Sequence, residues 1–399
     1  DLEPLDDVRR RVHSALALNV GGFLFFGARA DVAAELAEEI LSSADRPLWL
    51  AADLERGAGQ HFRGLTTFPP PAALAAHPRP EEAVRAAARR TALEARALGL
   101  NLALAPVLDL DVERRNPIVG TRSFGADPDT VAILGSVWIE ACQAEGVSAC
   151  AKHFPGHGRT TADSHAELPL VDADRATLED DLGPFGKAAS EVACVMTAHV
   201  AYPGLGGSGP ATLDSGILND LLRFQLGFEG LVLTDALNMS GAREGAVGSP
   251  EVAALSAGCD LLLYPPDLAA SVQAIETSAN EDPAVADRVL ESLARSGGLL
   301  DRFPARRGGD HGHPAEGAAT SEAIATACVM PVGGRPPEWL DPAAPVTVAT
   351  IWDDREDPAR APFGEPFRAV LTDRGWNVTA PGTAPDAQLI VLVASTPQA

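Results

Sequence analysis

The chain has 399 residues, of which 46% are hydrophobic, and a formal net charge of −24 at neutral pH. This length allows two domains with sizeable cores, and the hydrophobic content excludes an intrinsically disordered chain. The acidic balance argues against nucleic acid or an anionic membrane as a partner, because both require a basic face. No apolar run reaches the roughly eighteen residues that a membrane span needs.

Short apolar runs alternate with longer amphipathic segments over about the first 270 residues, a pattern typical of parallel α/β folds. Helix spacing is clear in the segments 81–98 and 129–145. The alternation predicts a TIM-type (β/α) barrel over residues 1–302. Only seven strands are found, so we expect the eighth to precede residue 1 or to escape detection. The predicted strands are 20–26, 47–52, 100–108, 147–151, 192–198, 231–234 and 260–264.

The composition changes after the predicted barrel. Residues 304–317 are rich in Pro, Gly, Arg, Asp and His, so we interpret 303–340 as a linker. Strands are then predicted at 346–351 and 388–394, with a helix at 366–374 between them. One βαβ unit is too small to bury a core alone. We therefore expect residues 341–399 either to pack on the barrel or, as the favoured interpretation, to begin a second α/β domain that is incomplete in this sequence.

The segment 152–165 is the most informative part of the chain. Its sequence, Lys-His-Phe-Pro-Gly-His-Gly-Arg-Thr-Thr-Ala-Asp-Ser-His, directly follows a predicted buried strand. A solvated turn is one interpretation, and a metal site with histidine and aspartate ligands is another. The spacing does not match a compact zinc motif, and Lys152 would place a cation beside the metal. A catalytic loop is favoured, because α/β barrels carry their reactive groups at strand ends.

Polar side chains follow four of the other predicted strands as well. Carboxylates, imidazoles and cations that converge on one barrel mouth can bind sugars, whose hydroxyls both donate and accept hydrogen bonds. Asp235 is the first ionisable residue after its strand, so it suits either a nucleophile or a helix N-cap. The residues after these strands are Asp53 and Glu55, Asp109 and Asp111, His199, and Asp235.

Together these motifs resemble glycoside hydrolase family 3, and specifically its β-N-acetylglucosaminidase branch. Segment 152–165 is similar to the signature of that branch, 122–125 (Arg-Ser-Phe-Gly) to its substrate-gripping segment, and 234–239 (Thr-Asp-Ala-Leu-Asn-Met) to its nucleophile segment. The resemblance covers about residues 20–264 and, more loosely, the C-terminal βαβ unit. The sequence departs from the family pattern at Arg159, at Ala236 and in the loop 54–59.

The resemblance implies a retaining mechanism with a covalent glycosyl-enzyme intermediate. It implies that Asp235 is the nucleophile, that His165 is the general acid and base, and that Asp163 orients His165. Sugar hydroxyls would be held by Asp53, Arg122, Lys152 and His153. His199 and Met196 either line the pocket or simply pack at strand ends. No metal and no cofactor is expected.

The predicted activity is that of an exo-β-N-acetylglucosaminidase acting on terminal N-acetylglucosamine. Alternatives are a β-N-acetylglucosaminide phosphorylase or β-glucosidase of the same family, and an inactive sugar-binding barrel. The aglycone (muropeptide, chitooligosaccharide or glycoprotein) and the oligomeric state stay open. The five cysteines are scattered, which fits a reducing compartment, so we expect a cytoplasmic protein.

Overall fold

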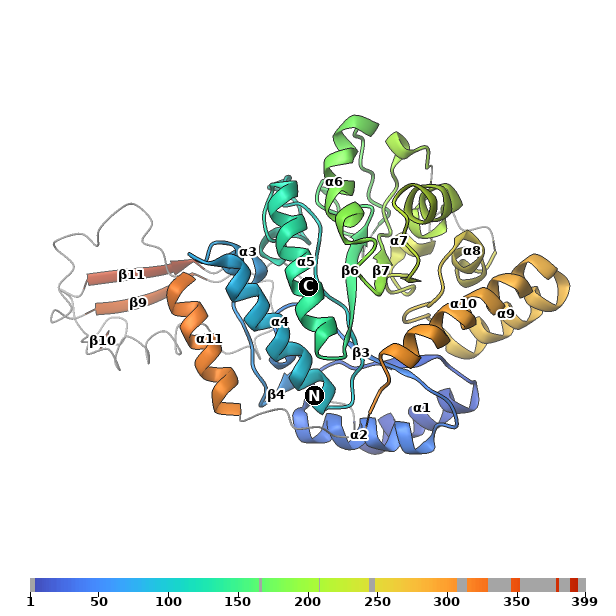
Figure 1. Ribbon diagram of the computed structural model, residues 1–399, viewed down its shortest axis with the longest axis horizontal. Helices are drawn as coiled ribbons and strands as arrows, with labels where there is room; N and C mark the ends of the chain where they lie inside the picture. The colour runs from blue at the N-terminus through green and yellow to red at the C-terminus, as the bar shows by residue number, and fades with distance from the viewer. Residues whose placement is uncertain are drawn as a thin grey trace. The chain divides into compact units, whose positions relative to one another are not determined.

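The computed structural model describes residues 4–164, 167–207, 209–243, 248–306, 314–328, 346–351, 378–379 and 388–393. Contacts between residues divide the chain into two compact units, 1–328 and 329–399. The first unit is an α/β fold, shown in blue to orange in Figure 1. No helix in the described part of the chain combines the length and apolar character needed to cross a bilayer.

The centre of the first unit is a curled, six-stranded parallel sheet with the order β1-β3-β5-β6-β7-β8. An isolated parallel bridge between Leu233 and Leu261 continues the sheet beyond its last strand. Since all strands are parallel, their carboxyl ends lie along one edge. Its strands are β1 (Gly22–Leu24), β3 (Trp49–Ala52), β5 (Leu102–Ala103), β6 (Ser148–Phe154), β7 (Cys194–Thr197) and β8 (Leu231–Leu233); β2 (Ala28–Arg29) and β4 (Phe62–Arg63) form a small separate pair.

Helices cover the outer face of this sheet (Figure 1). Aspartate side chains cap several of them; Asp127, for example, accepts a hydrogen bond from the amide of Thr130 at the start of α5. The helices of this unit are α1 (Leu5–Ala17), α2 (Ala30–Ser43), α3 (Pro71–Ala75), α4 (Pro80–Ala97), α5 (Pro128–Ala144), α6 (Arg175–Ala188), α7 (Ser240–Arg243), α8 (Pro250–Ala257), α9 (Leu268–Glu281), α10 (Pro283–Arg302) and α11 (Pro314–Cys328), with a π-helix, η5 (Gly216–Gln225).

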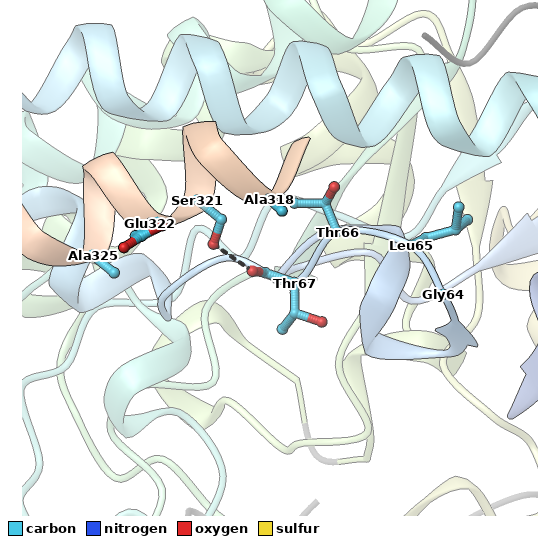
Figure 2. Close-up of a pocket in the computed structure, with 8 residues that line it drawn as sticks. All are labelled: Gly64, Leu65, Thr66, Thr67, Ala318, Ser321, Glu322 and Ala325. Carbon is cyan, nitrogen blue, oxygen red and sulfur yellow. Dashed lines mark hydrogen bonds between the residues drawn. The ribbon is translucent and has the colours of Figure 1, made fainter. Parts of the chain in front are cut away.

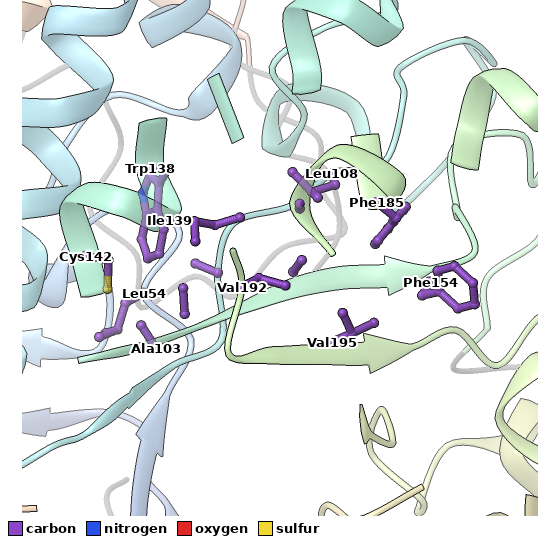
Figure 3. Packing of buried hydrophobic residues seen from close by; sticks show 14 of the residues in the cluster. Leu54, Ala103, Leu108, Trp138, Ile139, Cys142, Phe154, Phe185, Val192 and Val195 are labelled. Atoms are coloured by element: carbon purple, nitrogen blue, oxygen red, sulfur yellow. The ribbon is translucent and has the colours of Figure 1, made fainter. Parts of the chain in front are cut away.

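Two apolar clusters lie on opposite faces of the sheet. The larger one fills the layer between sheet and helices, where Trp138, Ile139 and Cys142 of α5 approach the strands (Figure 3). The smaller one fills the concave inside of the sheet and includes Trp49 and Met196. Because both faces are buried, the strands are continuous apolar runs rather than alternating ones.

Six of the seven strands predicted for the barrel are present in the sheet, and the seventh, 260–264, is not a full strand. Within it only Leu261 makes a bridge. Tyr264 has a left-handed backbone, with φ of +48°, and is followed by two prolines that lack an amide hydrogen. Both features prevent the run from continuing as a strand.

The second unit contains a three-stranded parallel sheet of order β10-β9-β11, with β9 (Val346–Ile351), β10 (Val378–Thr379) and β11 (Gln388–Val393). Strands were predicted at the places of β9 and β11, whereas β10 was not. The predicted helix 366–374 lies outside the described residues. Helix α11 lies within the predicted linker 303–340, and its Ser321 donates a hydrogen bond to the carbonyl of Thr67. The predicted domain boundaries themselves stay predictions.

Candidate active site

The polar side chains predicted to converge follow the carboxyl ends of β3, β5, β6, β7 and β8. Lys152 and His153 lie near the carboxyl end of β6 itself, directly before its last residue, Phe154. Asp53 and Asp235 are the first ionisable residues after β3 and β8. The strand order therefore places these residues on one edge, which is where parallel α/β sheets carry their sites.

Four charged side chains form one ion-pair network at this edge. Lys152 Nζ donates to Asp53 Oδ1 at 2.6 Å and lies 2.7 Å from Glu55 Oε1. Arg122 clamps Glu55 through two bonds, Nε to Oε2 at 2.9 Å and Nη2 to Oε1 at 2.7 Å. The Lys152 and Glu55 side chains are 2% and 5% exposed, whereas those of Asp53 and Arg122 are 27% and 25% exposed. Asp53 and Arg122 are therefore the two members most accessible to a ligand.

The network keeps its buried charges ionised. Burial alone would raise the pKa of Glu55, but Arg122 and Lys152 outweigh burial and hold that pKa well below its usual range. Burial would lower the pKa of Lys152, and Asp53 and Glu55 reverse that effect, so its pKa is raised. The site thus has fixed charges on both sides, which is suited to a ligand with many hydroxyls.

Asp109, the residue after the third predicted strand, anchors the polar loop. Its Oδ1 accepts the amides of His153 and His157 at 3.1 and 2.6 Å, and its Oδ2 lies 2.7 Å from His153 Nδ1. A carboxylate can only accept here, so Nδ1 of His153 carries the proton. No hydrogen bond from a described residue reaches Nε2 of His153.

The loop after His153 is packed tightly against the rest of the unit. A side chain at Gly158 would meet the carbonyl oxygen of Leu110 at 1.8 Å, so only glycine fits this approach. His157 bridges the loop, with Thr160 at 2.9 Å from Nδ1 and Ser164 at 3.1 Å from Nε2. Arg159 Nε donates to Asp181 Oδ2 of α6 at 2.5 Å. A side chain at Gly156 would likewise meet Cβ of Asp181 at 3.0 Å, so both loop glycines serve close packing.

Asp235 is held by the backbone. Its Oδ1 accepts the amide of Ala236 at 2.7 Å, and the residue is partly exposed. Burial raises its pKa, but His153, His199, the Ala236 amide and Lys152 together outweigh burial, so the pKa is lowered. A carboxylate that is ionised and reachable has the properties of a nucleophile.

His199 supports the segment 234–239, which contains Asp235. Its Nε2 lies 3.2 Å from the carbonyl of Ala236 and its Nδ1 lies 2.8 Å from the Thr212 hydroxyl. Burial lowers the pKa of His199, which favours the neutral ring. Because a carbonyl only accepts, Nε2 carries the proton and Nδ1 accepts from Thr212. Both ring nitrogens have protein partners, which makes His199 a support for Ala236.

The end of the polar loop contacts α7, the helix that follows Asp235. The amide of Gly241 in α7 donates to the carbonyl of Ser164 at 3.2 Å. A side chain at Gly241 would meet the carbonyls of Ser164, Glu167 and His199, each at 3.1 Å. Residues 163 and 164 are thereby brought close to the segment that starts at Asp235. The predicted acid and base, His165, lies outside the described residues.

The structure thus brings together most of the predicted site residues, although their roles stay predictions. Three of them, Asp53, Arg122 and Lys152, belong to the ion-pair network. His153 is the residue after Lys152. Met196 is 3% exposed and lies in the inner apolar cluster, which agrees with the second predicted role, packing at a strand end. The sequence interpretation assigned no role to Asp109 or Thr212; the position of Asp109 directly after a strand was the available signal.

The larger of two described cavities, about 580 Å³, lies elsewhere, between residues 64–67 and α11 (Figure 2). Glu322 is its sole ionisable lining residue. A second cavity of about 230 Å³ is lined by Glu113, Arg159 and Asp172 among others. We place the site at the strand ends because the paired charges are there. Among the described residues, no group of three or more His, Cys, Asp or Glu is arranged to hold a metal ion.

Comparison with known proteins identifies the class. The model of the glycosyl hydrolase family 3 N-terminal domain matches residues 9–295. The chain therefore belongs to glycosyl hydrolase family 3. This confirms the predicted family, the TIM-like α/β fold and the enzyme class, a glycoside hydrolase.

Individual relatives narrow the comparison. The chain is 39% identical over 328 residues to a beta-hexosaminidase of Thiobacillus denitrificans, covering 78% of this chain and 84% of that protein. It is 36% identical over 315 residues to a beta-N-acetylglucosaminidase/beta-glucosidase of Cellulomonas fimi, covering 76% of this chain but only 55% of that protein. A solved family 3 beta-N-acetylglucosaminidase from Paenibacillus is 31% identical, with a TM-score of 0.80, over 93% of this chain and 74% of that one.

Proposed function

We propose that the protein is a retaining exo-β-N-acetylglucosaminidase. The observation that carries the proposal is the ionised, backbone-held Asp235 beside the Asp53–Lys152–Glu55–Arg122 network, with the Ser164 carbonyl accepting the amide of Gly241, six residues after Asp235. The beta-hexosaminidase and beta-N-acetylglucosaminidase relatives support the choice of sugar.

In the first step, the Asp235 carboxylate attacks the anomeric carbon while the glycosidic carbon–oxygen bond breaks. His165 gives its proton to the departing oxygen. In the second step, His165 takes a proton from water, and the water oxygen replaces Asp235 at the anomeric carbon. Histidine suits both steps, because its usual pKa of about 6.5 lies near working pH.

The charged network binds the sugar in this proposal. Asp53 and Arg122 are its exposed members and contact hydroxyls directly, and His153 offers Nε2 to a further hydroxyl. Lys152 and Glu55 fix the exposed pair from behind. Asp109 holds the start of the loop that leads to Asp163.

Mechanism and substrate are tested with two measurements. A fluorinated N-acetylglucosamine derivative that keeps its acetamido group and has a good leaving group should trap the intermediate, and peptide mass spectrometry should find the label on Asp235. The value of kcat/KM on the nitrophenyl β-N-acetylglucosaminide should exceed that on the β-glucoside by about 100-fold. Label on another residue, or a preference for the glucoside, would contradict the proposal.

The general acid is tested by the leaving group. His165→Ala should slow a substrate with a sugar leaving group far more than one with a nitrophenyl group, which departs without a proton. Equal impairment of both would mean that His165 binds substrate instead. Added phosphate separates the alternative activity, because a phosphorylase would accumulate the sugar 1-phosphate.

Location and substrate source are parts of the same proposal. All five cysteines are free thiols and four of them are buried, which supports the predicted cytoplasmic location. The partner is a small molecule or oligosaccharide that ends in N-acetylglucosamine.

A further inference from the structure

Two aromatic side chains lie exposed at the strand edge that carries the site. Phe26 and Tyr264 are 54% and 55% exposed. Their rings contact each other edge to face, with 6.3 Å between centroids, and Phe26 also contacts His61 at 5.5 Å. Large apolar groups that are this exposed and adjacent often mark a binding surface.

The strand register places Phe26 level with Asp53. Leu24 pairs with Ala51 in the β1–β3 ladder, and both belong to the inner apolar cluster or pack against it. Side chains two residues further along point to the same side of a strand. Phe26 and Asp53 therefore extend from the inner face of the sheet at the mouth.

Tyr264 reaches this position through its backbone. Leu261 and Leu263 pack against the inner cluster, whereas Leu262 packs against the outer one. Continued alternation would direct Tyr264 outward, to the helix layer. Its left-handed φ of +48° breaks the alternation, and its ring contacts Phe26 instead. The amide of Leu237, two residues after Asp235, donates to the carbonyl of Leu263 at 2.9 Å, so Tyr264 is also adjacent to the nucleophile segment.

The ion-pair network and the aromatic pair differ in depth and chemistry. Lys152 and Glu55 are almost fully buried, whereas the aromatic pair is more than half exposed at the rim. A sugar ring has hydroxyls around its edge and apolar C–H groups on its faces. Charged groups bind the edge, and aromatic rings stack on the face. When the terminal sugar of an oligosaccharide is bound at the network, the rest of the oligosaccharide must extend out of the site past the aromatic pair at the rim.

We propose that Phe26 and Tyr264 form an aromatic platform that stacks against the first sugar of the leaving group. The platform rests on the proposed function, because it needs a glycoside whose terminal residue is held beside Asp235. It assigns the protein a preference for leaving groups that are themselves sugars.

The test compares two substrates that share the terminal N-acetylglucosamine. One is its β-1,4-linked disaccharide, and the other is β-N-acetylglucosaminyl fluoride, whose leaving group has no ring. The ratio of kcat/KM for disaccharide over fluoride should fall about ten-fold in Phe26→Ala and in Tyr264→Gly. Glycine suits the left-handed backbone at residue 264. Tyr264→Phe, which keeps the ring, should retain the wild-type ratio.

Phe224→Ala is the matched control, since Phe224 is 87% exposed on η5 and is not part of the platform. It should leave the ratio unchanged. A second readout uses the fluoride as donor and N-acetylglucosamine as acceptor, and the fraction of transfer product should fall in the platform variants.

An unchanged ratio in both platform variants would overturn the inference. So would a fall of the ratio in Phe224→Ala as well. An unchanged ratio together with a lower Tm would show that the rings pack against another part of the chain. If the wild type hydrolyses neither substrate, the proposed function fails, and the platform fails with it.

Discussion

The charged groups after β3 and at the end of β6 are held by one another, whereas the carboxylate after β8 is held by the backbone. Lys152 has two carboxylates within 2.7 Å. Asp235 accepts the Ala236 amide, and among the described residues no cation is paired with it at that distance. Losing a member of the first group leaves a buried charge without its partner. Losing the Asp235 charge leaves a polar group that the backbone still satisfies. The first group should therefore couple activity to stability, and Asp235 should separate them.

Asp235→Asn should have the largest effect on turnover. We expect a loss of about 10³-fold or more in kcat, because the covalent step of the proposed mechanism has no other nucleophile. The free energy of unfolding, measured in urea, should change by less than about 1 kcal/mol. Turnover near the wild-type rate, or a large loss of stability, would break the comparison from this side.

Lys152→Met should lower both activity and stability. Its removal leaves Asp53 and Glu55 beside each other, and breaking a buried pair costs about 3 kcal/mol of unfolding free energy. Arg85→Met is the control, since the Arg85–Glu140 pair is exposed and should be worth about 0.5 kcal/mol or less. Equal unfolding midpoints for the two variants would contradict a stabilising network.

Acid should weaken the loop through His157. Burial lowers the pKa of His157 to about 4. Its contribution to stability is complete above the unfolded pKa of about 6.5 and is lost as pH falls toward about 4, by about 3 kcal/mol. Urea unfolding at several pH values should give a flatter profile for His157→Gln than for the wild type. Parallel profiles would assign the acid sensitivity to other groups.

His199 should give the smallest effect, on kcat rather than KM. His199→Asn keeps an amide near the position of Nδ1 but loses the contact with Ala236, so kcat should fall about ten-fold. His199→Gln, whose side-chain amide reaches the position of Nε2, should keep most of the wild-type kcat. If Asn and Gln behave alike, the contact with Ala236 does not position the nucleophile.

The sheet could be predicted from the sequence because its strands are buried on both faces. Their apolar runs are local signals, and six of them became strands. The run 260–264 has the same apolar character, but a left-handed Tyr264 and two prolines end it after one bridge. The strand at 102–103 is shorter than its run of 100–108, in which Pro106 lacks an amide hydrogen.

The sequence predicted which residues form the site better than it predicted the contacts between them. Asp53, Lys152 and Asp235 stand at strand ends, which the sequence shows directly. The contact between Lys152 and Asp53 joins residues 99 positions apart, and the sequence holds no signal for its geometry. The anchoring role of Asp109 depends on three contacts with a loop 44 to 48 residues away. Such roles follow from tertiary packing alone.

Gly241 has a consequence for how such an enzyme can diversify. A Cβ at this position would lie 3.1 Å from three carbonyl oxygens, those of Ser164, Glu167 and His199, so any side chain would require them to shift. The spacing between the nucleophile segment and the loop of Asp163 is thus set by main-chain atoms. Substitutions of the surrounding side chains can then change which glycosides are accepted without altering this main-chain contact. A site built in this way can change in specificity while the contact between these two segments stays the same.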